Sequence, residues 1–103
     1  MAGNKILITD ADVASRNFIG AMLQKEGYQI LQAASGKEGL ISAWRDRPDL
    51  IIVDPAIPDL KGEDFAMRLR QDPRTAHTPL VALSSDSQPA RTRSCMDAGF
   101  MNI

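Results

Sequence analysis

The sequence predicts an α/β fold in which a parallel sheet carries helices on both faces. Two observations favour this fold class. Short apolar runs alternate with longer amphipathic stretches along the whole chain, which is the pattern of alternating strands and helices. The linkers give no sign of hairpins, so successive strands are expected to be parallel and joined by right-handed crossovers. With 103 residues, the chain has room for one domain with one core.

Four apolar runs predict strands, and a fifth begins near the end of the chain. In order, they are Lys5–Thr9, Tyr28–Ala33, Leu50–Val53, Leu80–Leu83 and the start of a strand at Phe100–Ile103. The third run is apolar at every position, which is typical of a central parallel strand covered on both faces.

Helices are predicted between these strands from their end signals. Asp12 is a plausible N-cap for the first helix, and Gly27 fits its C-terminal end. Ser35 and Glu38 have the spacing of a capping box for the second. A loop from 55 to 62 precedes the third, and Asp72-Pro73 stops it. Pro89–Ala98 predicts a fourth helix.

The apolar positions of each helix predict its buried face. The expected inward residues are Phe18, Ile19, Met22 and Leu23 in the first helix, Leu40, Ile41 and Trp44 in the second, and Phe65, Ala66, Leu69 and Met67 in the third.

Composition narrows the function classes. About 44% of residues are apolar and 24% are charged, with a net charge of −1. A nucleic-acid surface would need a basic stripe, and no apolar run approaches the roughly 20 residues of a membrane span. The single cysteine, Cys95, cannot form an intramolecular disulfide, which suits a reducing compartment. We expect a cytoplasmic protein that binds neither nucleic acid nor membrane.

Polar side chains end three of the predicted strands. Asp10, Asp54 and Ser84 follow the first, third and fourth apolar runs, and ligands of open parallel sheets bind outside the carboxyl ends of the strands. Two carboxylates close together disfavour joint ionisation. A divalent cation would remove that cost, and an open site of oxygen ligands suits Mg²⁺. Ser84 could donate a hydrogen bond to a phosphoryl oxygen there.

Sequence signals for other chemistries are missing. No glycine-rich loop follows the first strand, so neither the dinucleotide fingerprint nor the P-loop applies, and a flavin phosphate would also lack its cradle. A zinc site would need more than the single histidine, His77, and the single cysteine. The chain has no G-x-S-x-G nucleophile elbow. Trp44 and the methionines are interpreted as core residues.

Several segments together resemble the receiver domains of bacterial response regulators. They are Ile6-Leu-Ile-Thr-Asp10-Ala-Asp12 followed by Arg16, Pro48-Asp-Leu-Ile-Ile-Val-Asp54 followed by Ile57-Pro58 and Gly62, Leu69-Arg70, Thr78-Pro79-Leu-Val-Ala-Leu-Ser84-Ser85, and Ala98-Gly99. The segments occur in the family's order and spacing along almost the whole chain.

The resemblance implies a role for each matching position. Asp54 would accept a phosphoryl group from a histidine kinase or phosphotransfer protein, and the chain itself would not be an enzyme. Asp10, Asp54 and the backbone carbonyl of Ala56 would hold Mg²⁺. Ser84 would be the switch hydroxyl that moves toward the phosphorylated aspartate and alters the surface seen by an output partner. The implied fold is flavodoxin-like, with strand order 2-1-3-4-5.

The chain departs from the family pattern at two places. The family's second acid after Asp10 is replaced by Ala11, which leaves Asp12 as a possible acidic-pocket residue one position further on. The family's later lysine and last helix have no counterpart before Ile103, so we expect a C-terminally truncated domain with a shortened last strand. An uncovered sheet edge would favour a homo-oligomer. The alternative function is a degenerate pseudo-receiver that acts as a phosphorylation-independent interaction module.

Overall fold

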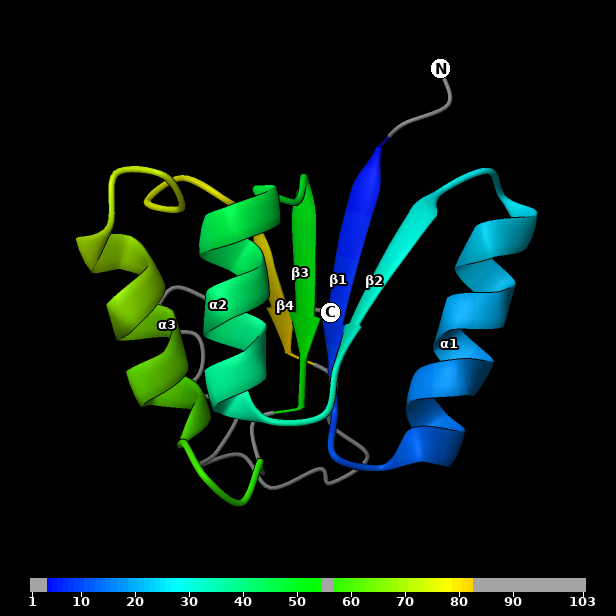
Figure 1. Cartoon of the computed structure of the whole chain (residues 1–103), viewed down its shortest axis with the longest axis horizontal. Coiled ribbons are helices and arrows are strands. Elements are labelled where there is room, and N and C mark those ends of the chain that lie inside the picture. The colour runs from blue at the N-terminus through cyan, green and yellow to red at the C-terminus, as the bar shows by residue number, and fades with distance from the viewer. Residues whose placement is uncertain (1–3, 55–56, 83–103) are drawn as a thin grey trace.

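The computed structural model describes residues 4–54 and 57–82. Strands and helices alternate strictly through this part of the chain (Figure 1). Their bounds are β1 Lys5–Thr9, α1 Val13–Lys25, β2 Gln29–Ala33, α2 Gly36–Asp46, β3 Leu50–Val53, α3 Gly62–Gln71 and β4 Leu80–Ala82. The α/β fold is therefore confirmed, and β2 begins one residue later than predicted.

The four strands form one parallel sheet in the order β2-β1-β3-β4. This is the predicted order 2-1-3-4-5 as far as the described residues reach. Residue 9 of β1 lies opposite Ala33 of β2 and Val53 of β3, so all three strands end together at one edge of the sheet. We call this the carboxyl edge.

Helices cover both faces of the sheet. A Cβ added to Gly20 of α1 would lie 3.5–3.8 Å from atoms of Ile30, Gln32 and Ile8, so α1 packs on the face that carries these side chains. Helices α2 and α3 pack on the opposite face, where Leu7, Ile51 and Val53 are fully buried. In Figure 1, α1 lies beside β2, whereas α2 and α3 lie together near β3 and β4. The sheet is therefore doubly wound.

The helix ends follow the capping chemistry expected from the sequence. The Asp12 side chain accepts a hydrogen bond from the backbone N–H of Ala14, and Ser35 accepts one from Glu38. At the end of α1, Gly27 has a φ of +95°, a left-handed conformation that glycine adopts without strain. The N–H of Tyr28 then reaches back to the carbonyl of Leu23 at 3.3 Å, which closes a Schellman motif.

The core fills the space between the sheet and helices α2 and α3. Its largest fully buried apolar side chains are Phe65, Leu7, Ile51, Leu69, Leu80 and Val53, whereas Ile8 is fully buried on the other face, under α1. Trp44 is partly buried against this cluster, in line with its interpretation as a core residue.

Four apolar residues predicted to face inward are instead largely exposed. Their exposed fractions are 67% for Phe18, 49% for Met22, 56% for Ile41 and 54% for Met67. Each directly precedes or follows a more buried neighbour, and successive helix positions are rotated by about 100°. On each helix, the stripe of apolar residues is thus wider than the face that packs against the rest of the protein. The predictions for these four residues were wrong.

Two further predictions cannot be compared with the structure. The fourth helix at Pro89–Ala98 and the fifth strand at Phe100–Ile103 lie outside the described residues, and the oligomer expected through them remains a prediction. Within residues 4–54 and 57–82, no helix has both the length and the apolar character to span a membrane.

Candidate functional site

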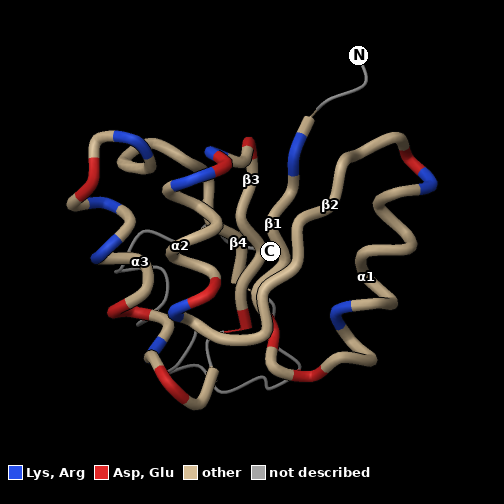
Figure 2. Tube along the Cα trace, in the orientation of Figure 1, with Lys and Arg blue, Asp and Glu red and all other residues tan. Residues whose placement is uncertain are grey.

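The candidate site lies at the carboxyl edge, where β1 and β3 end next to each other. Asp10 directly follows Thr9, and Asp54 directly follows Val53, the residue paired with Thr9. The N–H of Asp54 continues the ladder by donating to the carbonyl of Thr9 at 3.0 Å. The strand register therefore places the two aspartates side by side, as the sequence predicted. Figure 2 shows acidic positions gathered at this edge, below the ends of β1 and β3.

Asp10 is held firmly in this position. Its side chain belongs to a residue only 5% exposed, and Oδ1 accepts a hydrogen bond from the backbone N–H of Asp12 at 2.9 Å. Its own N–H donates to the carbonyl of Ala33. Arg16 donates from Nη1 to the Asp10 carbonyl at 2.6 Å and from Nε to the Gln32 side chain at 3.0 Å. The carboxylate is thus held through Oδ1 by one backbone N–H, and Arg16 and Ala33 hold the backbone that carries it.

Asp12 has a different use in this structure. Its exposed carboxylate caps α1 by accepting from Ala14 N–H at 3.2 Å and from the Ser15 hydroxyl at 2.8 Å. These bonds to Ser15 and then Ala14 lower the pKa of Asp12, because they stabilise the charged form. The side chain that was considered for the acidic pocket is therefore engaged at the start of the helix.

Asp54 is half-buried, and its backbone is held on both sides. Besides the bond from its N–H to Thr9, its carbonyl accepts from the N–H of Ile57 at 3.3 Å. Ile57 is itself buried, with 5% of its surface exposed. The backbone of Asp54 is therefore held at a defined position at the end of β3.

The donor set of the site suits a hard divalent cation. Asp10 and Asp54 offer carboxylate oxygens only, and Mg²⁺ in proteins takes one or two carboxylates and keeps several waters. Among residues 4–54 and 57–82, no group of three or more histidine, cysteine, aspartate or glutamate side chains gathers as a metal site. Ala56 and Ser84, the other two expected site residues, lie outside the described residues.

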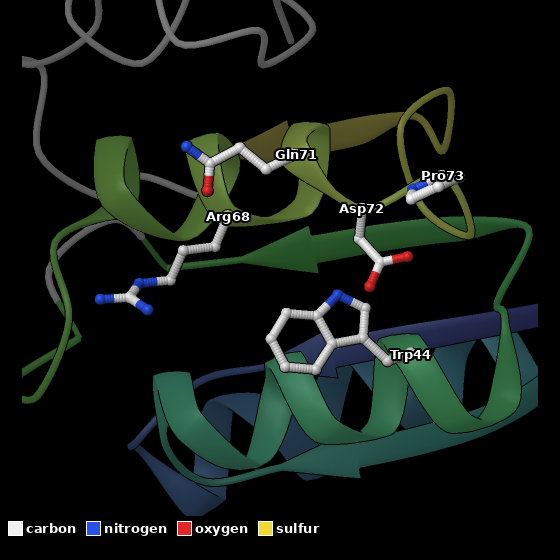
Figure 3. A pocket seen from close by; sticks show the side chains of 5 residues that line it. All are labelled: Trp44, Arg68, Gln71, Asp72 and Pro73. Carbon is white, nitrogen blue, oxygen red and sulfur yellow. The ribbon is translucent and has the colours of Figure 1, made fainter.

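A concavity lies away from the carboxyl edge, between the ends of α2 and α3 (Figure 3). It has a volume of about 260 Å³ and is lined by Trp44, Arg68, Gln71, Asp72 and Pro73. Arg74 is paired with Asp72 at 2.7 Å and lies 6.0 Å from the Trp44 ring. Because both helices end here, this hollow is near the amino ends of the strands and is separate from Asp10 and Asp54.

Comparison with known proteins agrees with this geometry. The family model described as response regulator receiver domain matches residues 6–103. The chain belongs to the receiver domain family. A rice (Oryza sativa subsp. japonica) protein, two-component response regulator ORR12, is 28% identical over 100 residues, which cover 96% of this chain and 83% of that protein.

Two solved structures place the fold among receiver domains. Chemotaxis response regulator CheY4 of Vibrio cholerae superimposes with a TM-score of 0.87 at 30% identity, covering 97% of this chain and 82% of that one. The receiver domain of sensor histidine kinase PA1611 from Pseudomonas aeruginosa PAO1 gives 0.88 at 29% identity, with coverages of 96% and 81%. The latter structure has a magnesium ion coordinated in its active-site cleft.

Two residues of this receiver make contacts near the site that were not predicted from the sequence. Arg16 was noted only as part of the family resemblance, and its bond to the Asp10 carbonyl depends on how α1 packs. Asp59 bonds to the start of α2, 22 and 23 residues earlier in the chain. Neither contact follows a local periodicity, and the only available signal for Asp59 was its place in the loop after Asp54.

Proposed function

We propose that this receiver accepts a phosphoryl group on Asp54 and signals through the resulting change in its surface. The observation that carries the proposal is the pairing of Asp10 and Asp54 at the ends of two in-register strands, on a sheet that belongs to the receiver family. The donor would be a phosphohistidine on a histidine kinase or phosphotransfer protein. We place this exchange in the cytoplasm.

The proposed chemistry is an in-line phosphoryl transfer. A carboxylate oxygen of Asp54 forms a bond to phosphorus while the phosphorus–nitrogen bond of the phosphohistidine breaks. The imidazole leaves and keeps its electron pair, and Asp54 becomes an acyl phosphate. Such transfers depend on positioning and on neutralising charge on the phosphoryl oxygens. In this scheme the chain is a substrate of its partner rather than an enzyme in its own right.

Asp10, Asp54 and the Ala56 carbonyl would hold Mg²⁺ at this site. When bound, the metal neutralises the phosphoryl oxygens and the neighbouring carboxylates. The bond from Asp12 N–H holds one Asp10 oxygen, and the Arg16 guanidinium fixes the Asp10 backbone. Asp10 can therefore present a carboxylate that needs little reorganisation. The magnesium ion in the PA1611 receiver supports this choice of metal.

Ser84 completes the proposal. As the switch hydroxyl, it would bond to the phosphoryl group on Asp54 and carry the change to the surface that an output partner binds. New charge at one residue can bias such a two-state element.

The second candidate function is a phosphorylation-independent interaction module. Two observations favour it. Ala11 stands where the family has a second acid, and the carboxylate of Asp12 is engaged at the cap of α1. The acidic pocket is then reduced to Asp10 and Asp54, which weakens the case for metal binding.

One experiment separates the two candidates. The chain is incubated with a small acyl-phosphate donor and Mg²⁺, and its intact mass is measured beside those of Asp54→Ala and Ala11→Asp. Asp64→Ala, which removes an exposed acid of α3, serves as the control. A phosphoryl mass that appears in the wild type and control and is lost in Asp54→Ala supports the first function.

The other outcomes count against it. A phosphoryl mass that persists in Asp54→Ala would place the acceptor elsewhere and refute the proposal. Addition to Ala11→Asp alone would support the interaction module, since restoring one acid would have restored the lost chemistry. An unmodified mass in every variant would also leave only that second function.

A further inference from the structure

The loop that follows Asp54 is anchored to the start of α2 by a single carboxylate. Asp59 Oδ1 accepts from the N–H of Gly36 at 2.8 Å, and Oδ2 accepts from the N–H of Lys37 at 3.1 Å. The first N–H groups of a helix have no partner within the helix. The cap residue Ser35 accepts a hydrogen bond from only one of these groups, the N–H of Glu38. Asp59 accepts hydrogen bonds from two others, although it belongs to a different segment of the chain.

Packing around this anchor is close. A Cβ at position 36 would lie 2.7 Å from the Leu60 Cβ and 3.3 Å from Asp59 Oδ1. Only glycine therefore lets the loop approach the helix this closely. Leu60 also packs against the core cluster, and Ile57 belongs to it. The contact between loop and helix combines charge, hydrogen bonds and apolar burial.

The same loop determines the backbone at the phosphoacceptor. Ile57, two residues before Asp59, donates its N–H to the Asp54 carbonyl at 3.3 Å. On its other side, Asp54 is bonded to Thr9 of β1. The strand side of Asp54 is thus fixed by the sheet, whereas its loop side is fixed by a segment anchored at Asp59.

We propose that Asp59 is a positioning residue for phosphoryl transfer at Asp54. It acts by holding the loop at the start of α2, so that the Asp54 carboxylate keeps the direction that in-line attack requires. This inference rests on the function proposed above. Misplacement of reacting groups by about 1 Å can cost up to about 100-fold in rate, so a modest loosening of the loop has a measurable effect.

The charge of Asp59 suits this role. Its bonds from Gly36 N–H and then Lys37 N–H lower its pKa, so the side chain is a carboxylate at neutral pH. A negative charge at a helix N-terminus is also favoured by the helix dipole. An asparagine would keep one accepting oxygen and lose the charge and the second acceptor. Asp59→Asn should therefore weaken the contact with α2 less than Asp59→Ala does.

The test compares rates of phosphoryl labelling by a small acyl-phosphate donor at saturating Mg²⁺, followed by intact mass. We expect labelling of Asp59→Ala to be about 10-fold slower than wild type, with Asp59→Asn in between. The limiting rate should fall while the donor concentration for half-maximal rate stays the same. Gly36→Ala, whose methyl would lie 2.7 Å from the Leu60 Cβ and 3.3 Å from Asp59 Oδ1, displaces the same loop and should slow labelling in the same way.

A matched control comes from the opposite end of the sheet. Asp49 Oδ2 accepts from the backbone N–H of Lys5 at 2.7 Å, so Asp49→Ala removes a similar carboxylate–backbone bond far from Asp54. Its labelling rate should stay within twofold of wild type. Hydrogen exchange of the Ile57 amide gives a second readout, and this exchange should become faster in both Asp59 variants and in Gly36→Ala but not in Asp49→Ala.

Each outcome bears on a separate statement. Labelling of Asp59→Ala at the wild-type rate overturns the inference and leaves the proposed function standing. Equal slowing in Asp49→Ala also overturns it, since a general loss of stability would then explain the effect. A wild-type chain that takes no phosphoryl group overturns the proposed function together with the rate effect. Unchanged Ile57 exchange in the Asp59 variants overturns the anchor itself.

Discussion

Thr9 carries a buried hydroxyl that finds no partner in the part of the chain that the structure describes. The residue is fully buried, and its Oγ1 has no hydrogen bond. It faces Gly39 of α2, where an added Cβ would lie only 2.7 Å from Oγ1. Valine has the same branched shape, and the missing Cβ of Gly39 leaves room for its second methyl. We therefore expect Thr9→Val to stabilise the protein.

The magnitude follows from the cost of the unpaired hydroxyl. A buried polar group without a partner costs about 1–3 kcal/mol, and valine in a strand avoids this cost without changing the packing. For a domain of about 100 residues, each 1 kcal/mol shifts the melting temperature by roughly 4–8 °C. Thermal unfolding followed by Trp44 fluorescence should thus show a melting temperature at least about 4 °C higher than that of wild type. Urea unfolding should show a higher midpoint concentration.

Thr75 provides the opposite case in the same fold. It is equally buried, but its hydroxyl donates to the carbonyl of Leu69 at 2.7 Å. Thr75→Val should therefore lower stability by about 1 kcal/mol. A melting temperature that falls in Thr9→Val as it does in Thr75→Val would refute the reasoning, because it would mean that the Thr9 hydroxyl is satisfied.

Two further predictions concern charge and backbone conformation. The side chain of Arg74, by hydrogen bonding, lowers the pKa of Asp72 to about 2, so this pair stabilises the fold above the unfolded value near 3.8 and loses its effect as the pH falls toward 2. The difference in urea midpoint between wild type and Asp72→Asn should be constant above about pH 5 and shrink below it; a difference that grows on acidification would contradict this assignment. Gly27→Ala should destabilise by about 1 kcal/mol, because φ is +95° there although nothing lies within 4 Å. Gly20→Ala should instead stabilise by about 0.5–1 kcal/mol, since its new methyl would meet neighbours at ordinary distances of 3.5–3.8 Å. Thermal unfolding of both variants tests these two predictions. Melting temperatures that shift in the same direction in both variants would contradict the roles given to backbone strain at Gly27 and to packing at Gly20.

Much of the fold could be predicted because its signals are local. Each strand is a short apolar run bounded by polar residues, and each helix start carries a side chain that can bond to its own first turn. Asp12 and Ser35 were recognised as caps for this reason, and both make those bonds. The alternation of strands and helices then leaves few arrangements, because parallel crossovers have one hand.

The errors came from features that depend on the neighbours of an element. The apolar pattern of α1 shows which residues could face the sheet, but Gly20 decides which do, because it allows close approach to Ile8 and Ile30. Phe18 is consequently turned toward solvent. The contact of Asp59 with α2 also depends on a distant part of the chain, since it joins segments more than 20 residues apart. No window of sequence contains both partners of such a contact.

Asp12 shows how one residue of spacing separates two functions. Its backbone has the extended conformation of an N-cap, with φ of −82° and ψ of 111°, and the capping bonds direct its carboxylate to the first turn of α1. A carboxylate at this position accepts hydrogen bonds from the N–H groups of the first helical turn, which have no partner within the helix. Position 11 lies between this cap and Asp10, and its alanine is exposed. Ala11→Asp would therefore add an acid next to Asp10 in the sequence while Asp12 keeps its cap, and we expect this change, rather than one at Asp12, to strengthen metal binding at Asp10 and Asp54.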